Sequence, residues 1–503
     1  MNNLKDVIIC SGSFVNDGLI NYFGEIPPAF LPIKGKLLIE FQLDSLKVEN
    51  FKEIYLTIPE TFKNDFRLKK IEKKYTYLKI FFTNHKNDLL LSLINIIQEY
   101  KINSSIVIMG DTFFKKIPHA HKYDKNIFSL NKSIKSFSWN KRENKILSGF
   151  FYFNDLNKLE LFKFNSFKMF LDSLIHENNN DLRFIDNLNW IDLGHFSNYI
   201  DNKFKFTTER EFNDLINNNG FFEKSSKKLN KITGEYLWFR NIDEELLQHV
   251  PKVFGYKNDG LNASYKIEKI HLPTLSEVYV FGNLNNQYLK NILDKCLNLI
   301  DLMRSENTLN SIPFWEGIKS KTLNRLKSIN FNLDDKIYLN DYPGISINEI
   351  LFSINTDIHE DTSSSVIHGD YCFSNLFYNN ISENIIMIDP RGINLNDEIT
   401  NYGNSLYDYG KLYHSVIGYY DHLVVGFYNI NVDGNRIFFE VLKNDNSEII
   451  KYLRKRLNEF DKHLIKLNIH LFLSMIPLHS ESKIKQSAFL ANAVRIYYQY
   501  HEI

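Results

Sequence analysis

Short apolar runs alternate with amphipathic stretches in the N-terminal part of the chain. Residues 6–10, 53–59 and 105–111 have the pattern of buried strands, and residues 38–46 place apolar side chains at helical spacing. A Lys-rich helix at residues 69–74 is expected to be a solvated face. Strands that alternate with helices predict an α/β domain with a Rossmann-like, mixed but mostly parallel sheet, in which ligands gather where the strands end.

The pattern changes after a polar, Asn-rich stretch at residues 201–220, which we interpret as the connection to a second domain. Downstream the sequence predicts strands at residues 221–226 and 264–270 and helices at 228–239, 287–302, 449–467 and 481–498. His479 falls in the loop before the last helix, where a packing role is the simplest interpretation. The predicted domains are residues 1–215 and 216–503, the second with a small lobe at 216–280 and a large helical lobe at 281–503.

Composition narrows the class of protein. The chain has 503 residues with 60 Lys and Arg and 60 Asp and Glu, so no basic surplus points to nucleic acid. Its cysteines, Cys10, Cys296 and Cys372, lack C-x-x-C spacing and fit a reducing cytoplasm. No apolar run has the length of a signal peptide core or a membrane span. We expect a cytoplasmic protein that binds small molecules, without membrane insertion.

The most informative stretch is His368-Gly369-Asp370, with Asn375 five residues after Asp370 and with Asp389 behind the apolar run 385–388. Phosphoryl transfer needs one carboxylate to accept the proton of a hydroxyl, and an amide oxygen and a second carboxylate to hold Mg²⁺. The spacing from Asp370 to Asn375 equals that of the protein-kinase catalytic loop. The alternative, a turn followed by an ordinary buried strand, does not account for the combined spacing.

Two upstream charges fit the same chemistry. Lys224 lies in the strand 221–226 and Glu235 lies in the following helix. In kinase-like folds such a pair holds the phosphates of ATP; Lys227 or Lys228 is the alternative lysine, and two exposed charges are the alternative interpretation. Glu268, near the end of the next strand, marks the expected hinge whose backbone meets the adenine.

Residues 366–413 resemble the aminoglycoside phosphotransferase and choline kinase family, whose pattern is H-G-D-x-x-x-x-N, then I-D, then a helix that begins near D-L-A. Asp408 stands in that last place. The resemblance implies an α+β, protein-kinase-like C-terminal domain in which Asp370 is the base, Asn375 and Asp389 hold magnesium and Asp408 supports the loop.

Two further residues of this stretch are interpreted from their position. His368 more plausibly braces the loop than performs acid–base work, because Asp370 already fills that role. Arg391 either binds a substrate carboxylate or phosphate or pairs with Asp408, and the sequence leaves both open.

The N-terminal part also carries a resemblance. Ser11 and Gly12 follow the first strand, where a nucleotide can bind. Residues 7–200 look like the nucleotidyltransferases that couple sugar phosphates or phosphocholine to nucleoside triphosphates: the run 31–40, Met109-Gly110-Asp111 and Trp190-Ile191-Asp192 match that family's motifs. The resemblance implies that Asp111 and Asp192 hold a divalent ion; the alternative is a pair of strand-end turn residues.

This domain departs from the family pattern at two cationic positions. Asn16 stands where the family loop carries an Arg, and Pro28 falls on the position of the catalytic Lys. A cation at the phosphate typically supplies orders of magnitude in rate. Lys34 or Lys36 is a possible substitute, so the domain is either catalytic or a nucleotide- or sugar-binding relic.

As a whole the chain resembles bacterial capsule-biosynthesis proteins that fuse these two kinds of domain. The resemblance implies a kinase that uses Mg²⁺ and ATP to phosphorylate a hydroxyl of a sugar, polyol or amino alcohol, followed by transfer of a nucleotide from CTP or another NTP. A kinase with an inactive N-terminal domain and a non-enzymatic regulator are the alternatives. An aminoglycoside-resistance kinase is disfavoured, because no acidic surplus near the C-terminus matches a polycationic drug. Acceptor, nucleobase and oligomeric state are not specified by the sequence.

Overall fold

The computed structural model describes residues 4–46, 51–84, 86, 88–117, 124–131, 141–142, 145–176, 181–186, 189–203, 214–218, 220–304, 307–308, 313–329, 332–356, 358–394 and 396–501. The chain divides into two compact units, each described by itself. Unit 1 comprises Met1–Thr207 with Phe281–Asn283, and unit 2 comprises Thr208–Val280 with Leu284–Ile503.

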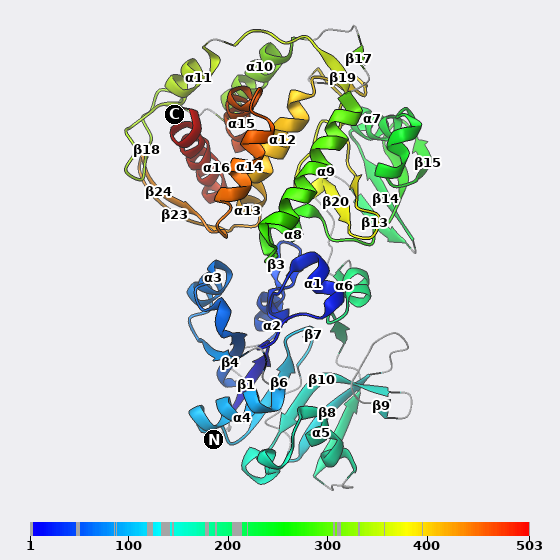
Figure 1. The fold of residues 1–503 in the computed structure, drawn as a ribbon, viewed down its shortest axis with the longest axis vertical. Coiled ribbons are helices and arrows are strands. Elements are labelled where there is room, and N and C mark those ends of the chain that lie inside the picture. Colours follow the sequence, from blue (N-terminus) through cyan, green and yellow to red (C-terminus); the bar gives the residue numbers. More distant parts are fainter. Residues whose placement is uncertain are drawn as a thin grey trace. The chain divides into compact units, whose positions relative to one another are not determined.

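Unit 1 is built on one mixed sheet with the strand order β11-β8-β10-β6-β1-β4-β5 (Figure 1). Its strands are β1 Lys5–Cys10, β4 Phe51–Pro59, β5 Leu78–Thr83, β6 Ser105–Met109, β8 Asn126–Asn131, β10 Lys145–Phe153 and β11 Leu182–Asp186. The pairs β1/β4, β1/β6, β4/β5 and β8/β11 are parallel, and β10 is antiparallel to both neighbours. The predicted α/β domain with a mostly parallel sheet is confirmed.

The helices of unit 1 follow from the apolar spacing of the sequence. They are α1 Asp17–Phe23, α2 Leu38–Ser45, α3 Phe66–Lys74, α4 Leu89–Tyr100, α5 Phe167–His176 and α6 Phe196–Lys203. Helix α4 begins at the cap Asp88, whose carboxylate accepts the N–H of Leu90 at 2.8 Å, and it buries Leu90, Leu93 and Ile94. A two-stranded pair, β7 Thr112–Phe114 with β12 Trp190–Asp192, brings the end of β6 beside residue 192.

Unit 2 opens with a small antiparallel sheet, order β13-β14-β16-β15, and one helix, α7 Leu229–Arg240. The strands are β13 Asp214–Asn218, β14 Phe221–Ser226, β15 Val253–Asn258 and β16 Ala263–Glu268. The prediction that residues 201–220 form only a connection is wrong for 214–218. That segment pairs with β14 from Asp214↔Ser225 to Asn218↔Phe221, because backbone pairing with a neighbouring strand outweighs a polar, Asn-rich composition.

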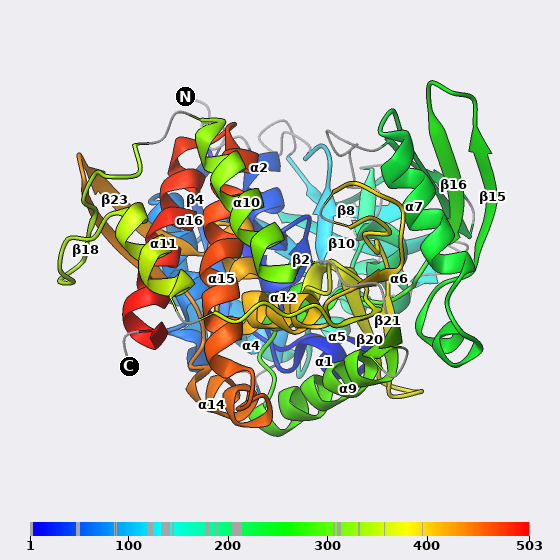
Figure 2. The same ribbon diagram turned by 90° about the horizontal axis from the view of Figure 1, so that it is seen from above.

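The rest of unit 2 is mainly helical. Its main helices are α8 Leu275–Phe281, α9 Asn286–Arg304, α10 Phe314–Lys327, α11 Ile347–Asn355, α12 Leu406–Val416, α13 Tyr420–Val424, α14 Ser447–Arg456, α15 Asp461–Met475 and α16 Lys483–Ile496. Helix α15 packs against α10, α12 and α16, and Figure 2 shows β15 and β16 at one edge of the view, well away from α15 and α16. The hairpin β20 Leu376–Asn379 with β21 Asn384–Met387 follows the short strand β19 Ser364–Val366.

The single helix predicted over residues 449–467 is wrong. The chain turns after Arg456, and α15 starts at Asp461. Arg454 donates to the Asp461 carboxylate across this corner, with Nη2 to Oδ2 at 2.9 Å. Apolar spacing continues through the turn, so the sequence pattern hides the break.

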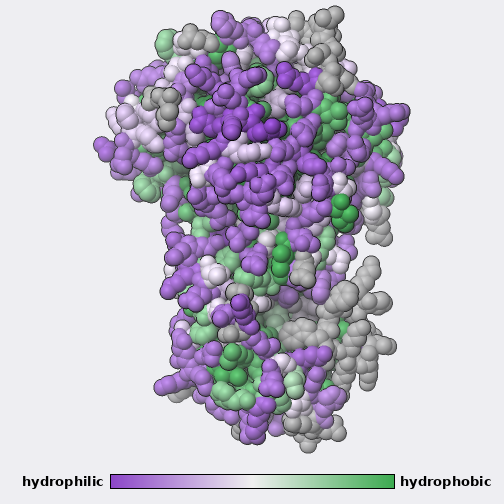
Figure 3. Space-filling model, viewed as in Figure 1, coloured by the Kyte–Doolittle hydropathy of each residue, from purple (hydrophilic) through white to green (hydrophobic). Residues whose placement is uncertain are grey.

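Apolar side chains fill the interiors of both units, and polar residues cover most of the face of unit 2 that Figure 3 shows. In the parts of the chain that the structure describes, every helix is too short or too polar to cross a membrane.

Candidate functional site

The stretch His368–Asp370 forms a tight loop that is held by a buried carboxylate. Asp408, on α12, accepts the N–H groups of His368 at 2.7 Å and of Gly369 at 2.8 Å. His368 is fully buried; its Nε2 lies 3.0 Å from the carbonyl oxygen of Ile388, and its Nδ1 accepts the N–H of Asp370 at 3.3 Å. Burial lowers the pKa of His368 to about 4, so the ring is neutral and fixes the loop.

Asp370 projects from this loop with its side chain 43% exposed. The Nζ of Lys411, one turn of α12 after Tyr407, lies 2.8 Å from Asp370 Oδ1. Desolvation raises the pKa of Asp370, but the Lys411 ammonium more than offsets this and the pKa is lowered to about 2. Asn375 Nδ2 donates to the backbone oxygen and to Oδ2 of Asp370 at 2.9 and 3.0 Å. Its Oδ1 accepts the Ser374 hydroxyl at 3.4 Å and, as a carbonyl-type oxygen, has a second lone pair for a cation.

Asp389 follows β21 and has a positive φ of 57°, a conformation uncommon for residues other than glycine. Lys224 Nζ on β14 lies 3.1 Å from Asp389 Oδ1 and 2.6 Å from Oε2 of Glu235 on α7. Both Lys224 and Glu235 are buried, and the Tyr265 hydroxyl donates to the same Glu235 oxygen at 3.0 Å. Burial lowers the pKa of Lys224, but the two carboxylates raise it above its ordinary value.

Close backbone contact fixes helix α7 against the segment after Asp389. A Cβ on Gly234 would lie 2.4 Å from the Gly392 carbonyl oxygen, so a side chain does not fit there. Trp238 Nε1 donates to the carbonyl oxygen of Ile367 at 2.7 Å, immediately before His368. The small sheet, α7 and the loop are therefore one packed arrangement within unit 2.

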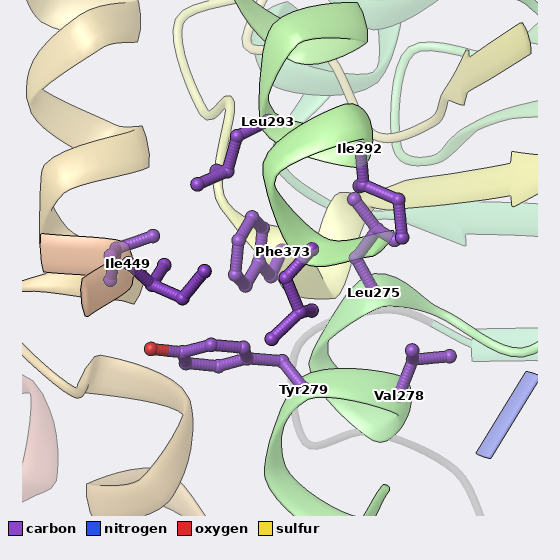
Figure 4. A pocket seen from close by; sticks show the side chains of 9 residues that line it. Leu275, Val278, Tyr279, Ile292, Leu293, Phe373 and Ile449 are labelled. Atoms are coloured by element: carbon purple, nitrogen blue, oxygen red, sulfur yellow. The ribbon is translucent and has the colours of Figure 1, made fainter. Parts of the chain in front are cut away.

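Phe373, three residues after Asp370, packs into the core and holds the loop His368–Asp370 in place. Its ring lies between α8 and α9 beside Leu275, Tyr279 and Leu293, as Figure 4 shows. The Phe373 and Tyr279 rings meet edge to face with centroids 5.1 Å apart. The apolar cavity that remains has a volume of about 10 Å³, no more than one water molecule needs, so its role is packing.

One cleft of about 930 Å³ in unit 2 is lined by Lys224, Glu235, Asp370, Asn375 and Asp389. Glu268, the expected hinge residue, does not line this cleft: its N–H donates to the Lys252 oxygen at 2.8 Å, and its Oε2 accepts the Lys252 N–H at 3.1 Å. Lys224, and not the alternatives Lys227 or Lys228, is the residue paired with Glu235.

Sequence reasoning named Arg391 as a candidate for binding a substrate anion but missed the other cationic residues of this cleft. Lys321 and Arg325 of α10, Tyr407 and Lys411 also line it. Spacing along the chain gives no signal for Lys321 and Arg325, because tertiary packing, including that of α10 against α15, brings them to the cleft. Among the described residues Arg391 forms no ion pair with Asp408; its Nη1 lies 3.5 Å from the Tyr407 hydroxyl.

In unit 1, Asp111 and Asp192 lie beside each other at the end of β6. A Cβ on Gly194 would lie 2.2 Å from Asp111 Oδ2 and 3.4 Å from Asp192 Oδ1. Burial, and next the charge of Asp192, raise the pKa of Asp111 to about 7. Asp192 accepts the Gly194 N–H at 2.9 Å and the amide of Asn198 at 2.6 Å. Two carboxylates are thus available to one cation.

Ser11 and Gly12 have structural contacts. The Ser11 N–H donates to Thr57 Oγ1 at 2.8 Å, its Oγ accepts the Ala29 N–H at 2.9 Å, and Gly12 O accepts the Thr83 hydroxyl at 2.9 Å. Asn16 Nδ2 donates to the carbonyl oxygen of Gly194.

The positions expected to carry cations in unit 1 lie in a 3-10 helix and the short hairpin after it. Pro28 is buried at the start of a 3-10 helix, and Lys34 and Lys36 lie exposed on the short hairpin of β2 Pro32–Ile33 and β3 Lys36–Leu37. In the described parts of the chain no cluster of three or more His, Cys, Asp or Glu side chains is arranged for a metal ion.

The N-terminal part of the chain, about 40% of it, resembles nucleotidyltransferases in solved structures. HddC from Yersinia pseudotuberculosis is 18% identical and aligns over 41% of this chain and 100% of that chain, with a TM-score of 0.34. The inositol-1-phosphate CTP transferase from T. maritima is 14% identical and aligns over 39% of this chain and 91% of that chain, with a TM-score of 0.33. The CTP:phosphocholine cytidylyltransferase from Streptococcus pneumoniae (LicC) is 15% identical over 41% and 100%, with a TM-score of 0.32.

No family model and no curated protein matches the chain. TM-scores this low carry no functional inference, so function rests on the chain's own residues.

Proposed function

We propose that the kinase-like part of the chain, residues 216–503, transfers the γ-phosphoryl group of ATP to a hydroxyl of a small molecule. The observation that carries the proposal is the convergence of Asp370, Asn375, Asp389 and the Lys224–Glu235 pair on one cleft. These are the groups that such a transfer needs, and they come from separate elements, β14, α7, the loop and the segment after β21.

Asp370 orients the acceptor and takes its proton. Because Lys411 keeps Asp370 ionised, the carboxylate accepts a hydrogen bond from the attacking hydroxyl throughout the ordinary pH range. A carboxylate of low pKa is a weak base. It suffices here, because phosphoryl transfer has a loose transition state in which the proton leaves late and positioning does most of the work. Lys411, beside Asp370, adds positive charge where the transferred group accumulates negative charge.

Asn375 Oδ1 and Asp389 are the ligands proposed for Mg²⁺, and an amide oxygen with a carboxylate fits this ion, which is usually bound by one or two protein groups, phosphate oxygens and water. Bound there, the ion would neutralise the charge of the β- and γ-phosphates. The buried Lys224, oriented by Glu235, is the cation proposed to bind the phosphates of ATP. We retain Glu268 as the marker of the adenine-binding hinge.

The test compares ADP formation by the full chain, with ATP and Mg²⁺, across sugars, polyols, amino alcohols and hydroxy acids. Asp370→Asn should lower the acceptor-dependent rate at least about 100-fold, in the range expected for loss of a general base. Asp433→Asn, an exposed carboxylate at the end of β23 Tyr428–Asp433, is the matched control and should retain the rate.

For unit 1 we propose binding of a nucleoside triphosphate and a divalent ion at Asp111 and Asp192, and transfer of its nucleotide to the phosphorylated product. The adjacent carboxylates favour this activity, and Pro28 and Asn16 favour the alternative of a binding domain without catalysis. With both activities the chain would make an activated precursor of a surface polysaccharide such as a capsule.

Pyrophosphate release separates the two alternatives for unit 1. If unit 1 is catalytic, sugar phosphates or phosphocholine with CTP or another NTP will release pyrophosphate, and Asp192→Asn will abolish the release while ADP formation by unit 2 continues. Silence with CTP, UTP, GTP and ATP would assign unit 1 to binding alone.

A further inference from the structure

Three cations line the cleft in unit 2, and two of them lie close to the same phenol oxygen. Lys321 and Arg325 are one turn apart on α10, and Arg391 follows Asp389 and Pro390. The Tyr407 hydroxyl lies 3.3 Å from Lys321 Nζ and 3.5 Å from Arg391 Nη1. Arg325 Nη1 donates to the carbonyl oxygen of Ser474 at 3.1 Å. We call Lys321, Arg325 and Arg391 the cation cluster.

The cation cluster adjoins the reacting carboxylate. A Cβ on Gly369, the residue before Asp370, would lie 2.7 Å from Arg391 Cβ. Tyr407 and Lys411 are one turn apart on α12, and Lys411 contacts Asp370. Asp370 and the cation cluster therefore line the same cleft, with Arg391 beside the loop that carries Asp370.

The cluster lacks the carboxylate partners that Lys224 and Lys411, two other cations of the cleft, have. Lys224 pairs with Glu235 and Asp389, and Lys411 pairs with Asp370. Across the described residues, none of the three side chains of the cation cluster forms an ion pair. Asp397 lines the same cleft, and its charge favours the protonated form of Arg325. Concentrated charge of one sign costs free energy that a bound anion would recover.

The pKa values of Tyr407 and Lys321 reflect the positive charge of the cation cluster. Burial raises the pKa of this phenol, but Lys321, Arg391 and Lys411 lower it to about 8. Burial, together with the charges of Arg391 and Arg325, lowers the pKa of Lys321. The lowered pKa of Tyr407 follows from the positive charges around it, and that of Lys321 follows from its burial and from the two neighbouring guanidinium groups.

We propose that the acceptor is an anionic hydroxyl compound, whose carboxylate or phosphate binds Lys321, Arg325 and Arg391 while its hydroxyl meets Asp370. This rests on the proposed function and narrows its acceptor class: amino alcohols and other cationic acceptors are excluded by repulsion. Two guanidinium groups and an ammonium suit a carboxylate or a phosphate equally, since both present several acceptor oxygens.

Binding to the full chain without nucleotide tests the inference separately from catalysis. Four probes of similar size are titrated calorimetrically at constant ionic strength: glycerol 3-phosphate, glycerate, glycerol and choline. We expect at least one anion to bind tenfold or more tightly than glycerol and choline. The order of the two anions distinguishes a phosphate-bearing from a carboxylate-bearing acceptor.

Substitutions in the cation cluster test whether the anion binds there. Lys321→Gln and Arg391→Gln should each weaken binding of the preferred anion at least tenfold. Lys327→Gln, an exposed lysine at the end of the same helix α10, should not change it. Lys224→Met should leave it within twofold, which separates this site from the one proposed for ATP. Thermal melting of each variant shows that it is folded.

The inference is overturned if choline or glycerol binds as tightly as the anions, if the anion binds equally well to Lys321→Gln and Arg391→Gln, or if Lys224→Met removes the binding. Failure of the proposed function has a different signature: the anion binds at the cluster, yet no acceptor stimulates ADP formation. If only a neutral or cationic acceptor is phosphorylated, the proposed kinase activity stands and the proposal of an anionic acceptor is wrong.

Discussion

Individual residues in unit 2 show where spacing along the chain suffices and where it does not. Asp370, Asn375, Asp389, Lys224 and Glu235 could be chosen from the sequence, because loop spacing and a strand–helix order preserve them as a pattern. Lys411 could not, since its importance lies in a 2.8 Å contact with Asp370 that only the packing of α12 creates. The same holds for Lys321 and Arg325.

His470 gives a prediction for stability against pH. It is buried on α15, with Nδ1 3.1 Å from Thr322 Oγ1 and Nε2 3.1 Å from Asn355 Oδ1. Burial lowers its pKa to about 3, so the folded state keeps the ring neutral, whereas the unfolded state binds a proton below its ordinary value of 6.5. The contribution of the neutral His470 ring to the free energy of unfolding is fully present above pH 6.5. It is lost as the pH falls toward 3, and the loss amounts to about 2 kcal/mol at pH 5.

Denaturant unfolding of unit 2, followed by fluorescence of the buried Trp238 and Trp315, measures this effect. His470→Gln should flatten the fall in unfolding free energy between pH 7 and pH 5 by about 2 kcal/mol. Equal falls in the two proteins would mean that His470 is already charged in the folded state.

At the scale of elements, the sequence pattern predicted strands and helices but not how they meet. Apolar spacing continued through the corner between α14 and α15, and β13 was hidden by its polar residues, because both depend on tertiary neighbours. The contact of α7 with the segment after Asp389 depends on two glycines, Gly234 and Gly392, which carry no signal in a single sequence.

Gly392 tests whether this contact positions the nucleotide site. Gly392 and Gly434 both have positive φ, 61° and 57°, but a Cβ on Gly392 would lie 2.2 Å from the backbone of Gly234, while Gly434 has open space. Both Ala variants should lose about 1 kcal/mol to backbone strain. Gly392→Ala should lose a further 1–3 kcal/mol, roughly, to overpacking.

The kinetic consequence should differ as well. Gly392→Ala displaces α7 and with it Glu235 and Lys224, so the KM for ATP should rise several-fold, whereas Gly434→Ala should leave it unchanged. Equal KM values in the two variants would mean that the α7 contact is structural only.

At the scale of the whole molecule, each unit presents its own pair of carboxylates. Asp111 and Asp192 lie together in unit 1, and Asp370 and Asp389 line one cleft in unit 2. The mostly parallel sheet of unit 1 followed from the alternation of strands and helices. The sequence did not decide whether unit 1 is catalytic, because Pro28 and Asn16 stand where a catalytic domain of this kind would carry a Lys and an Arg. The proposed acceptor class rests on charges that only the fold brings together.

The most direct test of the central claim is the transfer of ³²P from [γ-³²P]ATP to a hydroxyl acceptor by the full chain with Mg²⁺. We expect a phosphorylated acceptor whose formation requires Mg²⁺ and falls at least about 100-fold in Asp370→Asn, with Asp433→Asn unchanged. Transfer that continues at the wild-type rate in Asp370→Asn, or no transfer to any hydroxyl compound, would contradict the account and favour a non-enzymatic role.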